Sequence, residues 1–358
     1  MFVLRRLSGT AALVSMLTSA PAAALSVEFL TKITASDGGA GDQFGFSVAL
    51  DGTTALVGAP SNGGVGAGYA FDTQTLAETK LTATAGMAGD EVGFSVSLAD
   101  TTAVLGARFE GDDGFRSGAA FVFDLTLPGQ LRLSPLDNRA NDTFGFAVAT
   151  DGTNVFVAAP QDDDNGAASG SYYRFDTAGQ ELDKVLASDG GASERFGIAL
   201  DTDGTSVISG TRFDEILNPG VGAAYVFTTD GQEQAKLTPS DGAVGDLFGL
   251  AVAVEGLTAL AGAPGDDDNG LESGAAYVFD TAGQQQRKLT PDDGAEGDQF
   301  GRSLALSGGT ALIGAPLDDA NGASSGAAYL FDPLSGAQLL KIVAPDGALE
   351  DRFGLSVA

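Results

Sequence analysis

Aspartate and asparagine gather in three short loops of this sequence. The loops read Gln-Asp-Asp-Asp-Asn-Gly at 161–166, Gly-Asp-Asp-Asp-Asn-Gly at 265–270 and Leu-Asp-Asp-Ala-Asn-Gly at 317–322. Carboxylate and amide oxygens on glycine-containing loops are the ligands that Ca²⁺ prefers, in sets of about 6–8. The candidate metal ligands are Asp162, Asp163, Asp164, Asn165, Asp266, Asp267, Asp268, Asn269, Asp318, Asp319 and Asn321.

A second interpretation of these loops stays open. The Asp-x-Asp-x-Asp-Gly spacing of a calcium loop is not met, because the alternate positions before Gly166 hold Asn165, Asp163 and Gln161, and the first acid is missing. Asp, Asn and Gly are also common turn formers. Lysine and arginine are scarce in the sequence around the loops, which argues against phosphate binding. The sequence therefore predicts Ca²⁺ as a cofactor here, with solvated turns as the alternative.

Few side chains of this chain suit catalysis. It has no histidine and no cysteine, so the usual general base, the imidazole metal ligand and the thiolate nucleophile are missing. A Gly-x-Ser-x-Gly sequence at 322–326 lacks the following helix that a nucleophile elbow needs. Chemistry by a pair of carboxylates stays open, since acids are abundant. We expect a protein that is not an enzyme.

The charge of the chain limits its partners. It carries 48 acidic and 18 basic residues, a formal net charge of −30. Such a surface repels nucleic acid and anionic membranes and favours cations or cationic partners, although solubility or a salty habitat would also account for it. Without cysteine there are no disulfides, so burial must hold the fold together.

Seven copies of an aromatic-glycine pair divide the sequence into units of about fifty residues. Successive glycines of the pair are 48, 52, 52, 52, 52 and 53 residues apart, and a fixed period of this size indicates a repeat architecture. The pairs are Phe44-Gly45, Val92-Gly93, Phe144-Gly145, Phe196-Gly197, Phe248-Gly249, Phe300-Gly301 and Phe353-Gly354.

Each unit holds four short apolar runs that are typical of strands. The runs are about 4–7 residues long, are rich in Val, Ala, Leu, Tyr and Phe, and end at Gly, Asp, Asn or Pro. A tight Asp-Gly turn joins the first run to the second, as at 50–54 and 150–154. Four antiparallel strands per unit predict a propeller blade. The chain has no tryptophan, so the WD40 type of propeller is excluded.

The signature of each unit resembles the FG-GAP repeat of the integrin α-subunit propeller and its bacterial relatives. Phe-Gly is followed by Gly-Ala-Pro at 58–60, 262–264 and 314–316, and then by a strand of the type Gly-Ala-Tyr-Val-Phe. The resemblance covers roughly residues 30–358 and implies an all-β propeller. In integrin-type propellers the calcium loop lies between Phe-Gly and Gly-Ala-Pro, where this chain has only a tight turn, so the family's calcium site does not carry over.

Counting strands gives six complete four-stranded blades plus two strands of a seventh. The seventh would comprise residues 29–35 as its fourth strand and 353–358 as its first; a closed six-bladed ring is the alternative. The propeller would occupy residues 25–358 and be incomplete at its C-terminus. The acidic loops between strands two and three, and those between the fourth strand and the next blade, should share one face of the disc.

Residues 1–24 have the features of a secretory signal peptide. Arg5 and Arg6 precede the apolar stretch 11–17, which is too short to span a bilayer, and Ala22-Ala-Ala24 offers a cleavage site. An unprocessed apolar tail is the alternative. We therefore expect export to the periplasm, the cell surface or the medium, without membrane insertion.

Taken together, these features predict a secreted, non-enzymatic adhesion or recognition module, assisted by Ca²⁺, with an extracellular protein or glycan as ligand. The loops 108–116 and 212–219 break the repeat and are candidates for recognition. The third-strand tyrosines and phenylalanines, such as Tyr277 and Phe279, are expected to fill the core between blades. A secreted hydrolase or its accessory domain, acting on phosphate esters or polysaccharide, and a structural surface-layer component are the alternatives.

Overall fold

Strands form nearly all the regular structure of the chain. The computed structural model describes residues 2–6, 10–16, 27–212 and 220–358. Six antiparallel sheets of four strands each follow one another in sequence order. Within these ranges, no helix is long and apolar enough to cross a membrane. The prediction of six complete four-stranded blades is confirmed. The expectation that residues 353–358 form the first strand of a seventh blade is wrong, because the last strand of the chain ends at Ile342.

The first three blades are built as follows. Blade 1 comprises β4 (Val48–Asp51), β5 (Thr54–Ala59), β6 (Ala67–Asp72) and β7 (Glu78–Leu81). Blade 2 comprises β8 (Ser95–Ala99), β9 (Thr102–Ala107), β10 (Ala119–Asp124) and β11 (Leu131–Leu133). Blade 3 comprises β12 (Val148–Thr150), β13 (Asn154–Ala159), β14 (Ser171–Asp176) and β15 (Glu181–Val185).

The other three blades repeat the same plan. Blade 4 comprises β16 (Ala199–Thr202), β17 (Ser206–Thr211), β18 (Ala223–Thr228) and β19 (Glu233–Leu237). Blade 5 comprises β20 (Ala251–Glu255), β21 (Thr258–Ala263), β22 (Ala275–Asp280) and β23 (Gln285–Leu289). Blade 6 comprises β24 (Ser303–Ser307), β25 (Thr310–Ala315), β26 (Ala327–Asp332) and β27 (Ala337–Ile342).

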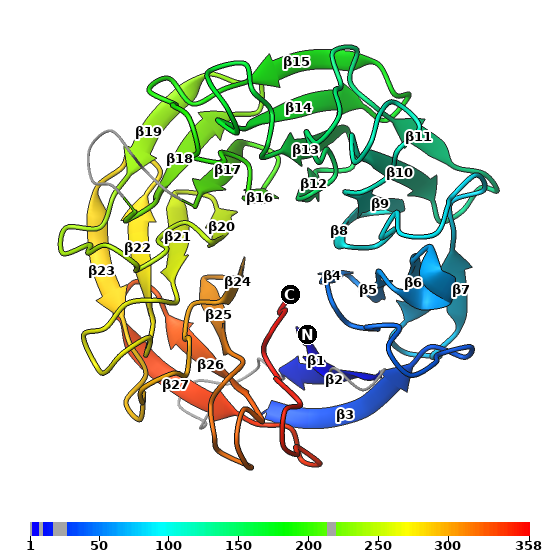
Figure 1. The fold of residues 1–358 in the computed structure, drawn as a ribbon. Coiled ribbons are helices and arrows are strands. Elements are labelled where there is room, and N and C mark those ends of the chain that lie inside the picture. The colour runs from blue at the N-terminus through cyan, green and yellow to red at the C-terminus, as the bar shows by residue number, and fades with distance from the viewer. Residues whose placement is uncertain (1, 7–9, 17–26, 213–219) are drawn as a thin grey trace.

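The blades are arranged round a ring, with the first strand of each at the centre and the fourth at the rim (Figure 1). Inside blade 5, Ala261 of β21 pairs with Tyr277 of β22, and Ala259 pairs with Phe279. The turn from β20 to β21 contains Gly256 at φ +59°, a conformation that glycine adopts without the cost of a side chain.

A three-stranded sheet lies in the ring between blade 6 and blade 1 (Figure 1). It contains β1 (Phe2–Arg6), β2 (Thr10–Met16) and β3 (Val27–Thr34), paired antiparallel. As expected for a fourth strand, β3 lies at the rim. β1 and β2 fall within the segment predicted to be a signal peptide, whose removal stays a prediction; residues 17–26 lie outside the described part of the chain.

The core lies between neighbouring blades. Phe248 is fully buried and meets the rings of Tyr277 and Phe279 edge to face, with centroids 5.5 and 5.8 Å apart. The same cluster includes Ile208 and Leu237 from blade 4, so each Phe-Gly pair joins two blades. Burying an aromatic side chain of this kind contributes about 2–3 kcal/mol. The expectation that these aromatics form the core is confirmed.

The glycine of Gly-Ala-Pro allows the next blade to approach closely. A Cβ on Gly262 would lie 2.0 Å from the carbonyl oxygen of Gly301, which belongs to the next Phe-Gly pair. Gly106 faces Gly145 and Gly314 faces Gly354 in the same way, at 2.0 and 1.9 Å. Any side chain at these positions would push the two backbones apart.

Candidate functional site

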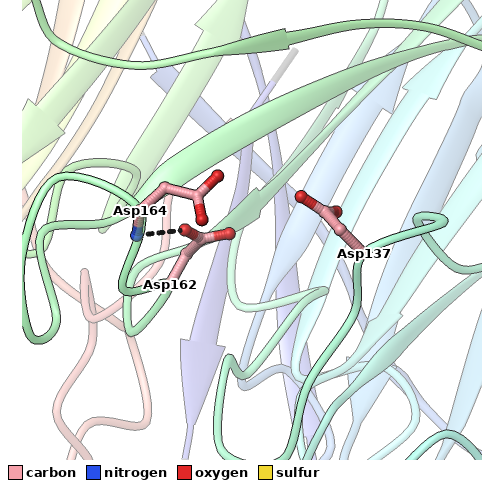
Figure 2. A group of neighbouring side chains, drawn as sticks. All are labelled: Asp137, Asp162 and Asp164. Carbon is pink, nitrogen blue, oxygen red and sulfur yellow. Dashed lines mark hydrogen bonds between the residues drawn. The ribbon is translucent and has the colours of Figure 1, made fainter.

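The two kinds of acidic loop meet on one face of the propeller, as the sequence predicted. In blade 3, Asp137 comes from the loop that leads from blade 2, while Asp162 and Asp164 come from the loop between β13 and β14. Their carboxylate oxygens lie within 4.8 Å of one another (Figure 2). The arrangement therefore ties each incoming loop to the blade that it enters.

The first aspartate of each candidate loop is buried beneath the others. Asp162, Asp266 and Asp318 are each 3% exposed. The tyrosine hydroxyl of the third strand lies against each carboxylate: Tyr173 is 2.8 Å from Asp162, and the equivalent distances in blades 5 and 6 are 2.9 and 2.8 Å. The second oxygen of Asp162 accepts the backbone N–H of Asp164, as Figure 2 shows.

A lysine ammonium lies at the centre of each of these clusters. Lys184 Nζ is 2.8 Å from Asp137, 2.8 Å from Asp162 and 2.6 Å from Asp164. In blade 5, Lys288 binds three aspartates at 2.6 to 3.0 Å, and in blade 6 Lys341 binds two at 2.7 and 2.8 Å. The expectation that basic residues are scarce around the loops is thus wrong, because the lysines reach in from the fourth strand.

The sequence contained a signal for these lysines that the analysis of the loops missed. Every lysine of the chain lies in β3 or in the fourth strand of a blade. Lys184, for example, lies 20 residues after Asp164 and 47 after Asp137. The lysines are Lys32, Lys80, Lys184, Lys236, Lys288 and Lys341. A lysine that recurs at one strand position indicates a contact that is repeated from blade to blade.

Charge and burial have opposite effects on the titration of the cluster. Burial alone would lower the pKa of Lys184, but its hydrogen bonds to three carboxylates outweigh that effect and raise the pKa. Burial would raise the pKa of Asp137, yet the ammonium of Lys184 and the hydroxyl of Tyr173 hold it below its usual value. Both groups are therefore charged at neutral pH.

The remaining candidate residues mostly shape the loops. One oxygen of Asp163 accepts the backbone N–H of Ala168 at 2.7 Å, and Asp267 and Asp319 make the same contact in their own loops. The backbone N–H groups of Asn165 and Asn321 donate to serine hydroxyls. Asp268 binds Lys288, and Asn269 occupies the position of Asn165 in blade 5.

Two blades vary the cluster in informative ways. In blade 1, Asn62 replaces the buried aspartate, and its amide oxygen accepts a hydrogen bond from Lys80 at 2.7 Å. In blade 2 a phenylalanine replaces the tyrosine, and Arg132 binds Glu110 at 2.8 Å and Asp113 at 2.7 Å. In both blades the basic side chain of the fourth strand thus keeps a polar partner in the loop, as a satisfied buried network requires.

In blade 3, the carboxylates that a Ca²⁺ ion would use are already engaged by a lysine. Among the described residues, the group suited to a metal is Asp137, Asp162 and Asp164, which offers three carboxylates where Ca²⁺ takes about 6–8 oxygens. The ammonium of Lys184 already binds all three. A dication would have to displace this charge or lie beside it. The Ca²⁺ prediction for the loops is not tested by this geometry and stays a prediction.

The repeat signature assigns the family. The FG-GAP repeat matches at residues 28–71, 76–123, 129–175, 180–227, 232–279 and 284–331. The chain belongs to the FG-GAP repeat family. No curated protein matches it in sequence. The FG-GAP propeller fold supports a ligand-binding or recognition role in general.

The first FG-GAP match begins at β3, and each of the other five begins at the fourth strand of one blade and ends in the third strand of the next. The match at 76–123, for example, contains β7 of blade 1 and β8 to β10 of blade 2. The sequence repeat is therefore offset from the blade by one strand. An FG-GAP unit that spans two blades joins them through the chain itself, and the packing of the Phe-Gly pair joins them through the core.

Proposed function

We propose that this FG-GAP propeller is a secreted, non-enzymatic recognition module that acts in adhesion to an extracellular protein or glycan. The observation that carries the proposal is the loop at 108–116 in blade 2. It presents aromatic and arginine side chains to solvent, and these are the residue types enriched where binding energy concentrates in protein interfaces.

The side chains of this loop are stacked on one another. Phe115 is 69% exposed. The Arg116 guanidinium lies 5.2 Å from the centre of the Phe115 ring and 4.4 Å from that of Phe109, and Arg108 covers the inner face of Phe109 at 4.4 Å. Stacking of this kind orients the rings before a ligand arrives, which reduces the entropy lost on binding.

The backbone of the loop is anchored at several points. The carbonyl oxygen of Phe115 accepts the N–H of Asn141 at 2.9 Å, and that of Arg116 accepts the N–H of Thr143 at 3.2 Å. Buried Glu110 holds the other side of the loop through Arg132. The equivalent loop of blade 4 is the second recognition candidate, and residues 213–219 of it lie outside the described part of the chain.

Binding of the labelled full chain to arrays of extracellular-matrix proteins and glycans tests the proposal. The double variant Phe115→Ala, Arg116→Ala should bind the identified array partner at least about tenfold more weakly. Leu257→Ala is the matched control, because Leu257 is 78% exposed but lies in a first-to-second-strand turn on the opposite face. Equal binding by both variants would count against the loop as the recognition site.

Export and the absence of catalysis are parts of the same proposal. Mass spectrometry of the exported protein should find an N-terminus near Leu25. Assays with phosphate esters and polysaccharides should show no turnover above that of a heat-unfolded sample. An intact N-terminus would contradict export. Saturable turnover would show that the protein is a hydrolase.

Ca²⁺ binding at the acidic loops is a separate prediction of the sequence, and thermal unfolding tests it. A ligand that binds only the folded state raises the midpoint by mass action. We expect Ca²⁺ and Mg²⁺ at matched ionic strength to shift the wild-type midpoint equally, relative to EDTA, because Lys184 occupies the cluster in Figure 2. Lys184→Met removes the ammonium, and only this variant should respond more to Ca²⁺. A Ca²⁺-specific shift in the wild type would support a metal at the loops.

A further inference from the structure

The centre of the propeller contains a cavity of about 670 Å³ on the face that carries the acidic loops. Its wall includes the residue that follows each aromatic-glycine pair, so all seven copies of the signal contribute one side chain. These residues are Phe46, Phe94, Phe146, Ile198, Leu250, Arg302 and Leu355. A cavity of this volume has the size of a small-molecule site.

Six of the seven ring positions are apolar, and Arg302 is the exception. The aromatic part of the wall is continuous, since the ring of Phe94 lies 4.9 Å from that of Phe46 and 5.2 Å from that of Phe146. Arg302 stands just before β24, which lies across the ring from β8 and β12 in Figure 1. The cavity thus has an aromatic side, where the Arg108 guanidinium lies 3.6 Å from the centre of the Phe94 ring, and a side that carries Arg302.

The Arg302 guanidinium makes no hydrogen bond or ion pair with any residue in the described ranges. Other arginines of this chain form ion pairs with carboxylates: Arg108 binds Glu91 at 2.7 Å, and Arg132 binds two acids. A guanidinium without a charge partner in a half-buried wall costs desolvation free energy. It stays unpaired although the chain contains 48 acidic residues. Burial, and then the charge of nearby Arg212, lower the pKa of Arg302.

The other charges on the cavity wall do not neutralise Arg302. Arg212 and Arg352 also line the cavity, and Glu272 is the acid among its described lining residues. One carboxylate oxygen of Glu272 accepts a hydrogen bond from Gln299 at 3.0 Å, at the side of the cavity. The described lining thus holds three arginines and one glutamate, on a chain whose net charge is strongly negative.

We propose that this central cavity binds a small organic carboxylate, with its carboxylate on Arg302 and its apolar body against Phe46, Phe94 and Phe146. A guanidinium offers paired N–H donors that match the two oxygens of a carboxylate. The aromatic wall favours a ligand whose body is apolar. This site goes beyond the recognition function proposed above and does not depend on it, because no residue of the loop in blade 2 lines the cavity; the contact between the two is Arg108, which stacks on Phe94.

Isothermal titration calorimetry with the full chain tests the site. The probe is 4-phenylbutyrate, with 4-phenylbutanamide as its neutral counterpart and acetate as an anion without an apolar body. We expect the wild type to bind 4-phenylbutyrate at least about tenfold more tightly than either control compound. Arg302→Leu, which installs the residue found at the equivalent positions 250 and 355, should lose that preference.

Arg287→Leu is the control variant, because Arg287 lies on the outer strand β23 and its Nε donates to the carbonyl oxygen of Leu334. It should bind the probe like the wild type. Arg302→Leu should unfold at the same temperature as the wild type or higher, since it removes an unpaired charge beside a second guanidinium. Absence of binding by the wild type, equal affinity for the acid and the amide, or unchanged binding by Arg302→Leu would overturn the proposal.

Discussion

At the scale of single residues, the lysine of the fourth strand determines how the acidic face behaves. Aspartates as close as Asp137, Asp162 and Asp164 would repel one another strongly at low dielectric. The ammonium of Lys184 compensates them, and its Nζ lies 5.0 Å from the centre of the Tyr173 ring. The cation that these carboxylates need is therefore a side chain of the protein itself. Replacing Lys184 would change both the stability of the fold and the charge of this face.

Replacing this lysine should be costly where the aspartate is buried and mild where it is not. Lys184→Met leaves Asp162 without its charge partner at 4% side-chain exposure and should lower the free energy of unfolding by about 3 kcal/mol. Lys80→Met is the matched control, because its loop contains neutral Asn62 and a half-exposed aspartate, and should lose about 1 kcal/mol. Urea unfolding measures both; equal losses would mean that the buried charge is unimportant.

The buried carboxyls predict that stability rises on mild acidification. Burial raises the pKa of Asp142 and Asp298 to about 6 and that of Asp201 to about 7. Their folded pKa values exceed the unfolded value of about 3.9, so the folded state binds these protons more tightly and gains stability as the pH falls from 7 towards 4. The pKa of Asp137 is lowered by Lys184, so its contribution is lost below about pH 4.

The expected maximum of stability thus lies between about pH 4 and 6. Chemical unfolding at pH 7.5, 5 and 3 measures it, and Asp142→Asn should reduce the gain between pH 7.5 and 5. A steady loss of stability from pH 7.5 to pH 5 would show that the lowered pKa values of the lysine-bound aspartates dominate instead.

At the scale of the elements, the junction between blades depends on contact between two backbones. Gly262→Ala would place a methyl group 2.0 Å from the Gly301 carbonyl and should cost about 3 kcal/mol of stability. Gly256→Ala is the control, since its φ is +59° but no atom lies within 4 Å of its Cβ, and should cost about 1 kcal/mol. Thermal unfolding compares the two; a larger loss for Gly256→Ala would contradict tight packing of the blades.

The elements also show why the fold could be predicted and the site only in part. Strand positions follow from local patterns, such as the apolar runs that became β21 and β22, and the buried aromatics follow from their place two residues apart on one strand. The cluster at Asp162 depends on contacts between three segments. Lys184 lies 20 residues after Asp164 and 47 after Asp137, so inspection of each loop by itself could not reveal it.

At the scale of the whole molecule, local compensation and global repulsion act together. In blades 3, 5 and 6 a lysine neutralises the buried aspartate of the loop between the second and third strands, yet 48 acids against 18 bases leave a large net negative charge over the surface. Exposed charges are screened over about 10 Å at 0.1 M salt, whereas partly buried pairs are screened much less. Salt should therefore weaken the repulsion more than it weakens the clusters.

This balance predicts that neutral salt stabilises the propeller. Raising NaCl from 20 to 500 mM should increase the melting temperature, because a net charge of −30 destabilises the compact state through self-repulsion. KCl should have the same effect at equal ionic strength, since screening does not depend on the identity of the cation. Lys184→Met carries one more net negative charge, so its melting temperature should rise at least as much. A fall with added salt in the wild type would mean that the lysine–aspartate clusters, rather than the surface repulsion, dominate the electrostatic stability of the ring.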